Sequence, residues 1–205
     1  MAEKNTVRQQ ILDAAKKRFS HFGYAKTTMA EVAADCRMSP GNLYRFFAGK
    51  LDIAEAIATV EHELHLEDMR KLLAAPGKSA GERLRDYFFE EMRRTYKTLE
   101  ENPRIQEIAG LIASQRPHYA DWMRASSRKL LVGLFDEAER NGEFRPGDKE
   151  FAVEMIQAAT MKFRYPQLWT KLTLPQLERE LDGVLKLVVN GLNAQKAHKH
   201  AAPAE

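Results

Sequence analysis

The sequence has a single cysteine and no long hydrophobic run. Because Cys36 is alone, the 205-residue chain cannot close an internal disulfide, which fits a reducing compartment. No stretch approaches the ~18 uncharged apolar residues of a membrane-spanning helix, and the first ten residues have no apolar core of signal-peptide length. We therefore expect a cytoplasmic protein that does not contact a membrane.

Familiar catalytic signatures are missing as well. The chain has no phosphate-binding loop, no G-x-S-x-G, no H-E-x-x-H and no cysteine–histidine pair in a supporting context. We expect neither enzyme activity nor a cofactor. Residues 61–65 (EHELH) set two histidines beside carboxylates, but at i and i+3 rather than at the i and i+4 of a helical zinc pair. An exposed polar face is the favoured interpretation, and we expect no metal site.

Positive charge is concentrated at one end of the chain. Residues 1–50 hold nine Lys or Arg against four acids, a net charge of +5, so the +3 of the whole chain leaves −2 for residues 51–205. A basic head on a slightly acidic body is expected where one end meets a polyanion, although a merely solvated surface has the same composition.

Strands are not indicated, because no Val/Ile/Thr run alternates with polar residues. Apolar residues instead recur at helical spacing, and capping residues mark helix starts. The sequence predicts an all-α fold of about nine helices: from Thr6 to Phe22, from Thr28 to about Cys36, from Ser39 onward, from Leu51 to the AAPG stretch, from Ser79 to about Leu99, a short one after Asn102-Pro103, from about His118 to Arg140, from Asp148 to before Tyr165, and from Thr173 to about residue 193.

The strongest change in composition lies near residue 50 and predicts two domains. Residues 1–50 form a three-helix head, and residues 51–193 form a larger helical domain. Residues 194–205 are a small polar tail that we expect to be disordered.

Two short capped helices and a four-residue turn fit between Thr28 and Phe47. This spacing is typical of a helix-turn-helix, whose second helix enters the major groove of DNA, although an ordinary helical corner has the same spacing. The residue types favour DNA binding. Small side chains that let the backbone approach DNA come first (Ser39, Pro40, Gly41), then an amide that can pair with a base edge (Asn42), then donors for flanking phosphates (Tyr44, Arg45, Lys50).

A close resemblance to the N-terminal DNA-binding domain of the TetR family is found in ILDAAKKRFSHFGYAKTTMAEVAADCRMSPGNLYRFFAGKLDIAEAI. The segment matches the family's pattern of an IL-AA-F-G helix, a TT pair and S-x-x-x-LY-x-x-F-x-x-K, over about a quarter of the chain. The resemblance implies a dimeric regulator with two such heads. We expect a homodimeric repressor of a palindromic double-stranded DNA operator that is released by an unknown small-molecule effector; the sequence leaves open an effector that strengthens DNA binding instead. The resemblance implies further that residues 51–193 bind this effector between helices and dimerise through the last helices.

The resemblance also suggests roles for single residues. Four residues occupy positions that contact DNA phosphates in the family: Thr27, Thr28, Tyr44 and Lys50. Three occupy positions that face the groove: Gly41, Asn42 and Arg45. At the turn the sequence departs from the usual Ala-Gly-Val-Ser, because Arg37 stands in the glycine position. If the backbone there keeps a positive φ, an arginine carries strain, and a cation beside DNA is a reason to tolerate it.

Beyond residue 60 the resemblance gives no ligand identity. Aromatic and sulfur-bearing side chains are candidates for an apolar pocket, although each also fits an ordinary core: Phe89, Met92, Tyr96, Trp122, Met123, Met155 and Phe163. Arg164 fits either an anchor for an anionic ligand or a solvated charge. The apolar stripe of residues 175–193 predicts a dimer interface at Leu177, Leu181, Val184 and Val188. The alternative function is a helical scaffold that binds only protein.

Overall fold

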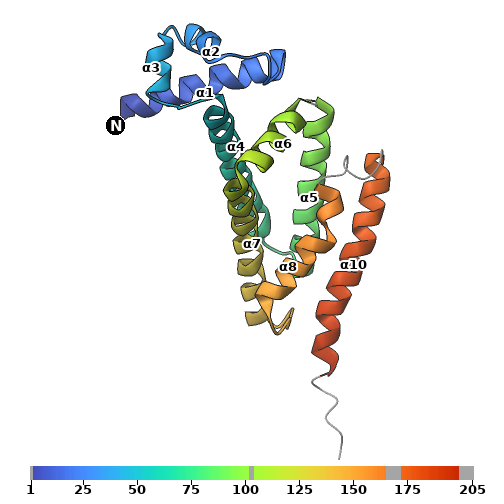
Figure 1. Ribbon diagram of the computed structural model, residues 1–205. Coiled ribbons are helices and arrows are strands. Elements are labelled where there is room, and N and C mark those ends of the chain that lie inside the picture. Colours follow the sequence, from blue (N-terminus) through green and yellow to red (C-terminus); the bar gives the residue numbers. More distant parts are fainter. Residues whose placement is uncertain (1, 102–103, 165–171, 199–205) are drawn as a thin grey trace, which may run out of the picture. The chain divides into compact units, whose positions relative to one another are not determined.

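Helices make up all the regular structure in residues 2–101, 104–164 and 172–198, which are the residues that the computed structural model describes (Figure 1). None of these helices is long and apolar enough to cross a membrane. They are α1 (Ala2–Phe22), α2 (Met29–Asp35), α3 (Pro40–Tyr44), α4 (Lys50–Leu73), α5 (Ala80–Glu101), α6 (Ile105–Gln115), α7 (Pro117–Arg140), α8 (Lys149–Ala159), α9 (Met161–Arg164) and α10 (Leu174–His198).

The chain divides into two compact units, but not at residue 50. Unit 1 consists of Met1–His65 and Thr98–Met123, and unit 2 of Leu66–Lys97 and Arg124–Glu205. The hydrophobic core of unit 1 explains the difference, because Ile112 of α6 and Tyr119 of α7 are buried in it. They join residues of the first four helices, among them Ile11, Phe19, Val32, Leu43 and Ile53.

Capping side chains set the starts of α2 and α3 in unit 1, as the sequence predicts. Thr28 caps α2 in a capping box with Glu31, and Ser39 caps α3 ahead of Pro40. After α1, Gly23 takes a φ of +92° and donates its N–H to the Phe19 carbonyl at 3.1 Å. The predicted start of α1 at Thr6 is wrong, because the helix begins at Ala2.

The core of unit 2 is built around α5. Its apolar face, with Leu84, Phe88 and Met92, is buried against residues of α7 and α10. Ion pairs along the edge fix how α10 lies on α5: Arg85 Nη2 is 3.0 Å from Asp182 Oδ1, and Arg93 Nε is 2.7 Å from Glu178 Oε1. From Arg85 to Arg93 the residue number increases along α5, whereas their partners on α10 go from Asp182 back to Glu178. The two helices are therefore antiparallel.

Two predicted boundaries in unit 2 are wrong. The helix expected from Asp148 to before Tyr165 is broken at Thr160, whose hydroxyl donates to the Ile156 carbonyl at 2.8 Å, so α8 and α9 are separate. At the other end α10 continues to His198, which makes residues 194–198 of the predicted tail helical. The rest of that tail, residues 199–205, and Tyr165 lie outside the described residues.

Candidate nucleic-acid interface

The helix-turn-helix of unit 1 is held from the inside. Val32 and Ala33 of α2 and Leu43 of α3 are fully buried in the unit 1 core. In the turn, Met38 donates its N–H to the Ala33 carbonyl at 3.0 Å. Because one side of α3 is fixed by Leu43, its opposite side faces solvent.

The outer side of α3 carries most of the predicted DNA contacts. Ser39, Pro40, Gly41, Tyr44 and Arg45 are exposed, and Asn42 is half-buried. A Cβ added at Gly41 would meet no atom within 4 Å, so the fold itself does not require glycine at this position. The surface at the start of α3 is therefore bare enough for another molecule to approach the backbone.

Arg37 has the unusual backbone that its place in the turn suggested. Its φ of +54° is the only positive φ of a non-glycine residue among the described residues. The side chain is exposed, and the Arg37 N–H donates to the Ala34 carbonyl at 3.0 Å. The strain expected from arginine in the glycine position is thus present in the fold.

The two neighbouring threonines differ. Thr28 is exposed, and both its N–H and its hydroxyl donate to Glu31 Oε2 at 2.8 Å, which lowers the pKa of Glu31. Thr27 is 1% exposed, and its hydroxyl donates to the Gly23 carbonyl at 2.9 Å. The expectation of a phosphate contact through the Thr27 side chain is therefore corrected: that side chain holds the loop before α2.

Lys50 also has an internal role. Its ammonium donates to the carbonyls of Tyr24 at 2.6 Å and Thr27 at 2.8 Å, and lies 4.2 Å from the centre of the Tyr24 ring. Burial lowers the pKa of Lys50. The ammonium thus ties the start of α4 to the loop between α1 and α2, and it would have to leave these partners to meet a phosphate.

Other polar contacts that orient the head link residues far apart in sequence, where no local pattern could reveal them. Arg18 of α1 pairs with Asp35 of α2 at 2.5 Å. Arg116, after α6, pairs with Asp52 at 2.8 Å and with Glu55 at 3.0 Å, both on α4. Because α6 and the start of α7 also enter the core, unit 1 is a head braced by later helices.

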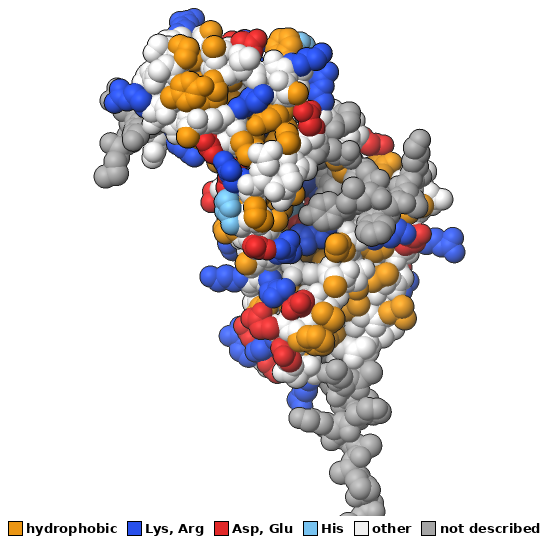
Figure 2. Space-filling view, in the orientation of Figure 1, with side chains coloured by type: hydrophobic (Ala, Val, Ile, Leu, Met, Phe, Trp, Pro, Cys, Tyr) orange, Lys and Arg blue, Asp and Glu red, His pale blue; other side chains and the backbone are white. Residues whose placement is uncertain are grey.

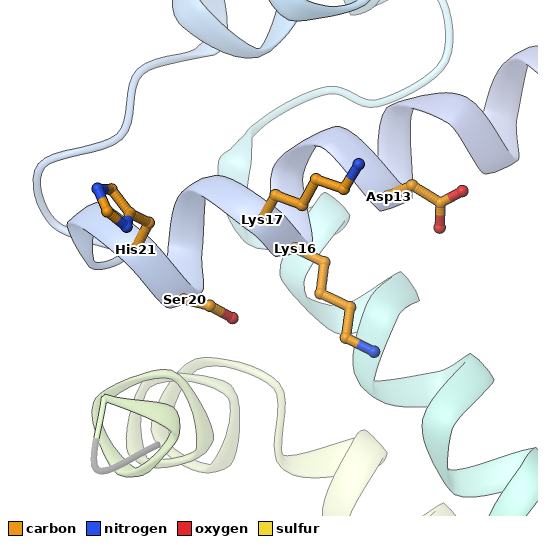
Figure 3. A pocket seen from close by; sticks show the side chains of 5 residues that line it. All are labelled: Asp13, Lys16, Lys17, Ser20 and His21. Atoms are coloured by element: carbon orange, nitrogen blue, oxygen red, sulfur yellow. The ribbon is translucent and has the colours of Figure 1, made fainter. Parts of the chain in front are cut away.

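One hollow in unit 1 lies on α1 (Figure 3). Among the described residues, those that line it have polar side chains and all belong to α1: Asp13, Lys16, Lys17, Ser20 and His21. Lys16 is paired with Glu61 of α4 at 2.6 Å. The hollow contains none of the side chains predicted to line an apolar pocket.

The residues predicted for the effector pocket are divided between the units. Phe89, Met92 and Phe163 are buried in the core of unit 2, and Tyr96 packs against that core. Trp122 and Met123 belong to unit 1, where Trp122 packs against His62 with ring centres 5.0 Å apart. Met155 is 42% exposed. Only the four residues of the unit 2 core therefore share one environment.

Two of the predicted dimer residues face the wrong way. Leu177 and Leu181 are fully buried in the core of their own chain, and Val184 and Val188 pack against the same core. The most exposed large apolar side chains on α8 and α10 are instead Leu187 of α10, at 76%, and Phe151 of α8, at 58%. A space-filling view shows hydrophobic side chains at the surface over α8 and α10 (Figure 2).

The structure also corrects the expectations for two polar residues, His65 and Arg164. His65 is buried at 8% exposure, so the exposed polar face expected for residues 61–65 is wrong at this position. Arg164 is not a fully solvated charge, because its side chain is 20% exposed and lies 3.9 Å from Glu91.

Comparison with known families agrees with this architecture. Residues 11–57 match the family of bacterial regulatory proteins called the tetR family, and residues 80–185 match the tetracyclin repressor-like C-terminal domain. The chain belongs to the TetR family. It is accordingly a transcriptional regulator with a DNA-binding helix-turn-helix, in a family of regulators rather than enzymes.

Individual relatives extend over the whole chain or over the head alone. An uncharacterized HTH-type transcriptional regulator, YhgD of Bacillus subtilis (strain 168), is 27% identical over 194 residues, covering 90% of this chain and 95% of the relative. The regulator HbdR of Aromatoleum sp. (strain CIB) is 44% identical over 46 residues, covering 22% of this chain and 20% of that protein.

Solved structures share the fold. A TetR-family regulator from Pectobacterium atrosepticum has a TM-score of 0.73 at 20% identity, covering 94% of this chain and 96% of its own. Thermus thermophilus FadR, a TetR-family repressor solved in complex with lauroyl-CoA, has a TM-score of 0.65 at 20% identity, covering 90% and 94%.

Proposed function

We propose that this protein is a homodimeric repressor that binds a palindromic operator and leaves it when a small-molecule effector binds. The observation that carries the DNA-binding part is the outer side of α3. It is exposed, bare at Gly41 and bordered by Tyr44 and Arg45, while Leu43 fixes the opposite side in the core. Such a helix suits the major groove, with its first residues on base edges.

The residues proposed to contact DNA fall into two groups, those that meet bases and those that meet phosphates. Ser39, Pro40, Gly41 and Asn42 lie at the start of α3 and are proposed to meet bases, with the Asn42 amide as the donor and acceptor. Arg37, Tyr44 and Arg45 are proposed to meet phosphates or the groove edge. Thr28 remains a proposed phosphate contact, and its exposed hydroxyl would have to leave Glu31 Oε2 to donate to a phosphate.

A second copy of this chain is the proposed occupant of the outer face of α10. Gly183, Leu187 and Gly191 follow each other at intervals of one turn, and Leu187 is 76% exposed. A Cβ at either glycine would meet nothing within 4 Å in the chain itself. Each glycine inside a helix is about 1 kcal/mol less favourable than alanine, which supports close packing by another backbone. Phe151 and Met155 of α8 supply further exposed apolar area of the kind that obligate dimers bury.

The effector is proposed to bind in unit 2, among Phe89, Met92, Tyr96 and Phe163. These side chains suit a molecule with an apolar body. Lauroyl-CoA is the ligand of Thermus thermophilus FadR, and the shared fold makes acyl compounds a rational first group to test here. A compound that releases the operator from the wild-type protein should fail to do so with Phe89→Ala if the site is correct.

Operator selection from random duplexes, followed by salt titration, tests the DNA-binding part. We expect an enriched palindrome or near-palindrome, and an affinity that falls steeply as salt rises, because phosphate contacts release counterions. The alternative, a scaffold that binds only protein, predicts no affinity for any duplex. Enrichment of an asymmetric single site would contradict two identical heads.

Leu187→Glu tests the dimer. Burying a carboxylate in an apolar interface should give monomers by sedimentation and remove operator binding. Lys186→Glu is the control for an added carboxylate at the adjacent exposed position, about 100° around the helix. It changes the charge by two units and also removes the ion pair of Lys186 with Asp182, so an intact dimer in this variant would show that the effect of Leu187→Glu depends on its position. A Leu187→Glu protein that remains dimeric would place the interface elsewhere.

A further inference from the structure

We propose that Arg8 is a further DNA contact: its guanidinium is held over the Phe47 ring, where it binds a backbone phosphate beside the recognition helix α3. This inference rests on the proposed operator binding and adds to it a residue outside the helix-turn-helix. It assigns the partner by chemistry, as a DNA phosphate rather than a base.

The position of Arg8 is set by apolar packing. The guanidinium carbon lies 4.9 Å from the centre of the Phe47 ring. Phe47 is 5% exposed and Leu12, one turn after Arg8, is 3% exposed, and both belong to the unit 1 core. The aliphatic part of Arg8 is therefore on the side of α1 that faces this core, and the residue as a whole is exposed, an arrangement typical of long basic side chains.

The charge of Arg8 is also available. Three other cations of the head are engaged: Arg18 with Asp35, Lys16 with Glu61, and Lys50 with loop carbonyls. Within the described residues, no carboxylate lies within ion-pair distance of Arg8. A guanidinium that stacks on a ring keeps its full charge, so an incoming anion finds it both oriented and unneutralised.

The location is appropriate for the DNA backbone. Phe47 follows α3 by three residues, so Arg8 lies near the C-terminal end of α3, away from the Ser39–Gly41 end that is proposed to meet bases. Leu12 of α1 and Leu43 of α3 are buried in the same core. A helix in the major groove is flanked by phosphates, and an arginine already held by a ring loses little further freedom when it binds one.

The experiment compares Arg8→Met with Lys17→Met on the selected operator and on random duplex, each across a range of salt concentrations. Lys17 is the matched control: it is an exposed cation on the same helix, nine residues further, which is the opposite side of α1. We expect Arg8→Met to weaken both duplexes by about tenfold at 0.1 M salt and to lower the salt slope by about one. Lys17→Met should stay within about twofold of wild type.

Arg8→Lys separates charge from geometry, because it retains the charge but not the planar group. It should keep the salt slope and lose a few-fold in affinity. An unchanged slope in Arg8→Met, a loss confined to the operator, or an equal loss in Lys17→Met would each overturn the proposal. So would a loss explained by a lower melting temperature of Arg8→Met. Failure of the wild-type protein to bind any duplex would instead defeat the proposed function as a whole.

Discussion

Arg37 is the position where one substitution should separate folding stability from DNA binding. Its φ of +54° places it in the left-handed region, where a residue with a Cβ is disfavoured by roughly 1–2 kcal/mol. Arg37→Gly removes this strain but gives the unfolded chain more freedom, an opposing effect of about 0.4–1 kcal/mol. The free energy of unfolding should therefore rise by roughly 0 to 1.5 kcal/mol.

DNA binding should change in the opposite direction. Arg37 is exposed beside α3, so Arg37→Gly removes a positive charge from the proposed interface and should weaken binding to every duplex. Arg37→Ala is the control, because it removes the same charge and keeps the Cβ. It should bind DNA like the glycine variant, but should be less stable than that variant by about 1 kcal/mol.

Urea unfolding followed by circular dichroism gives the stabilities, and salt titrations of DNA binding give the charge effect. Equal stability of the glycine and alanine variants would refute the strain argument, and so would destabilisation by Arg37→Gly of more than about 1 kcal/mol. A salt slope unchanged in both variants would independently refute a phosphate contact at Arg37.

Three further substitutions test the head. Asn42→Ala should lower discrimination at one base pair by about 1–3 kcal/mol; an equal loss on all sequences would make Asn42 a phosphate contact. The Lys50 ammonium binds loop carbonyls, so Lys50→Met should lower the free energy of unfolding in urea by about 1–3 kcal/mol and leave the salt slope of DNA binding unchanged. A salt slope lower by about one would instead indicate that Lys50 contacts a phosphate. Glu31 has a lowered pKa in the fold, so its stabilisation is full above about pH 4.3 and is lost as pH falls through the lowered value. Melting temperatures of Glu31→Gln should accordingly fall less between pH 6 and pH 3 than those of wild type, and parallel curves would contradict this.

Local signals in the sequence predicted local structure well. The capping residues Thr28, Ser39 and Asp148 each begin a helix, because a side-chain oxygen satisfies a backbone N–H wherever the rest of the chain lies. The same kind of signal failed at Thr6, where the helix already extends four residues further toward the N-terminus. A capping pattern inside a helix has nothing to cap, and sequence alone does not distinguish the two cases.

The direction in which a side chain faces was harder to predict. The apolar stripe of α10 was correctly identified, but Leu177 and Leu181 are buried in their own chain, while Leu187 is exposed. The periodicity of the sequence gives the angle between residues around the helix axis. Which face of α10 is turned toward the core is decided only by its packing against α5. Likewise Thr27 and Thr28 have the same chemistry and adjacent positions, yet the first is buried and the second caps a helix.

Burial of Ile112 and Tyr119 in the core of unit 1 limits how this regulator can be recombined with others. Their exposures of 3% and 7% mean that they cover apolar surface contributed by the first four helices. A chimera that takes only residues 1–50 from this chain would inherit surfaces shaped for these two side chains and place them against foreign ones. Exchange of operator specificity between family members should therefore succeed when residues of α6 and the start of α7 are transferred together with the head, and yield poorly folded hybrids when they are not.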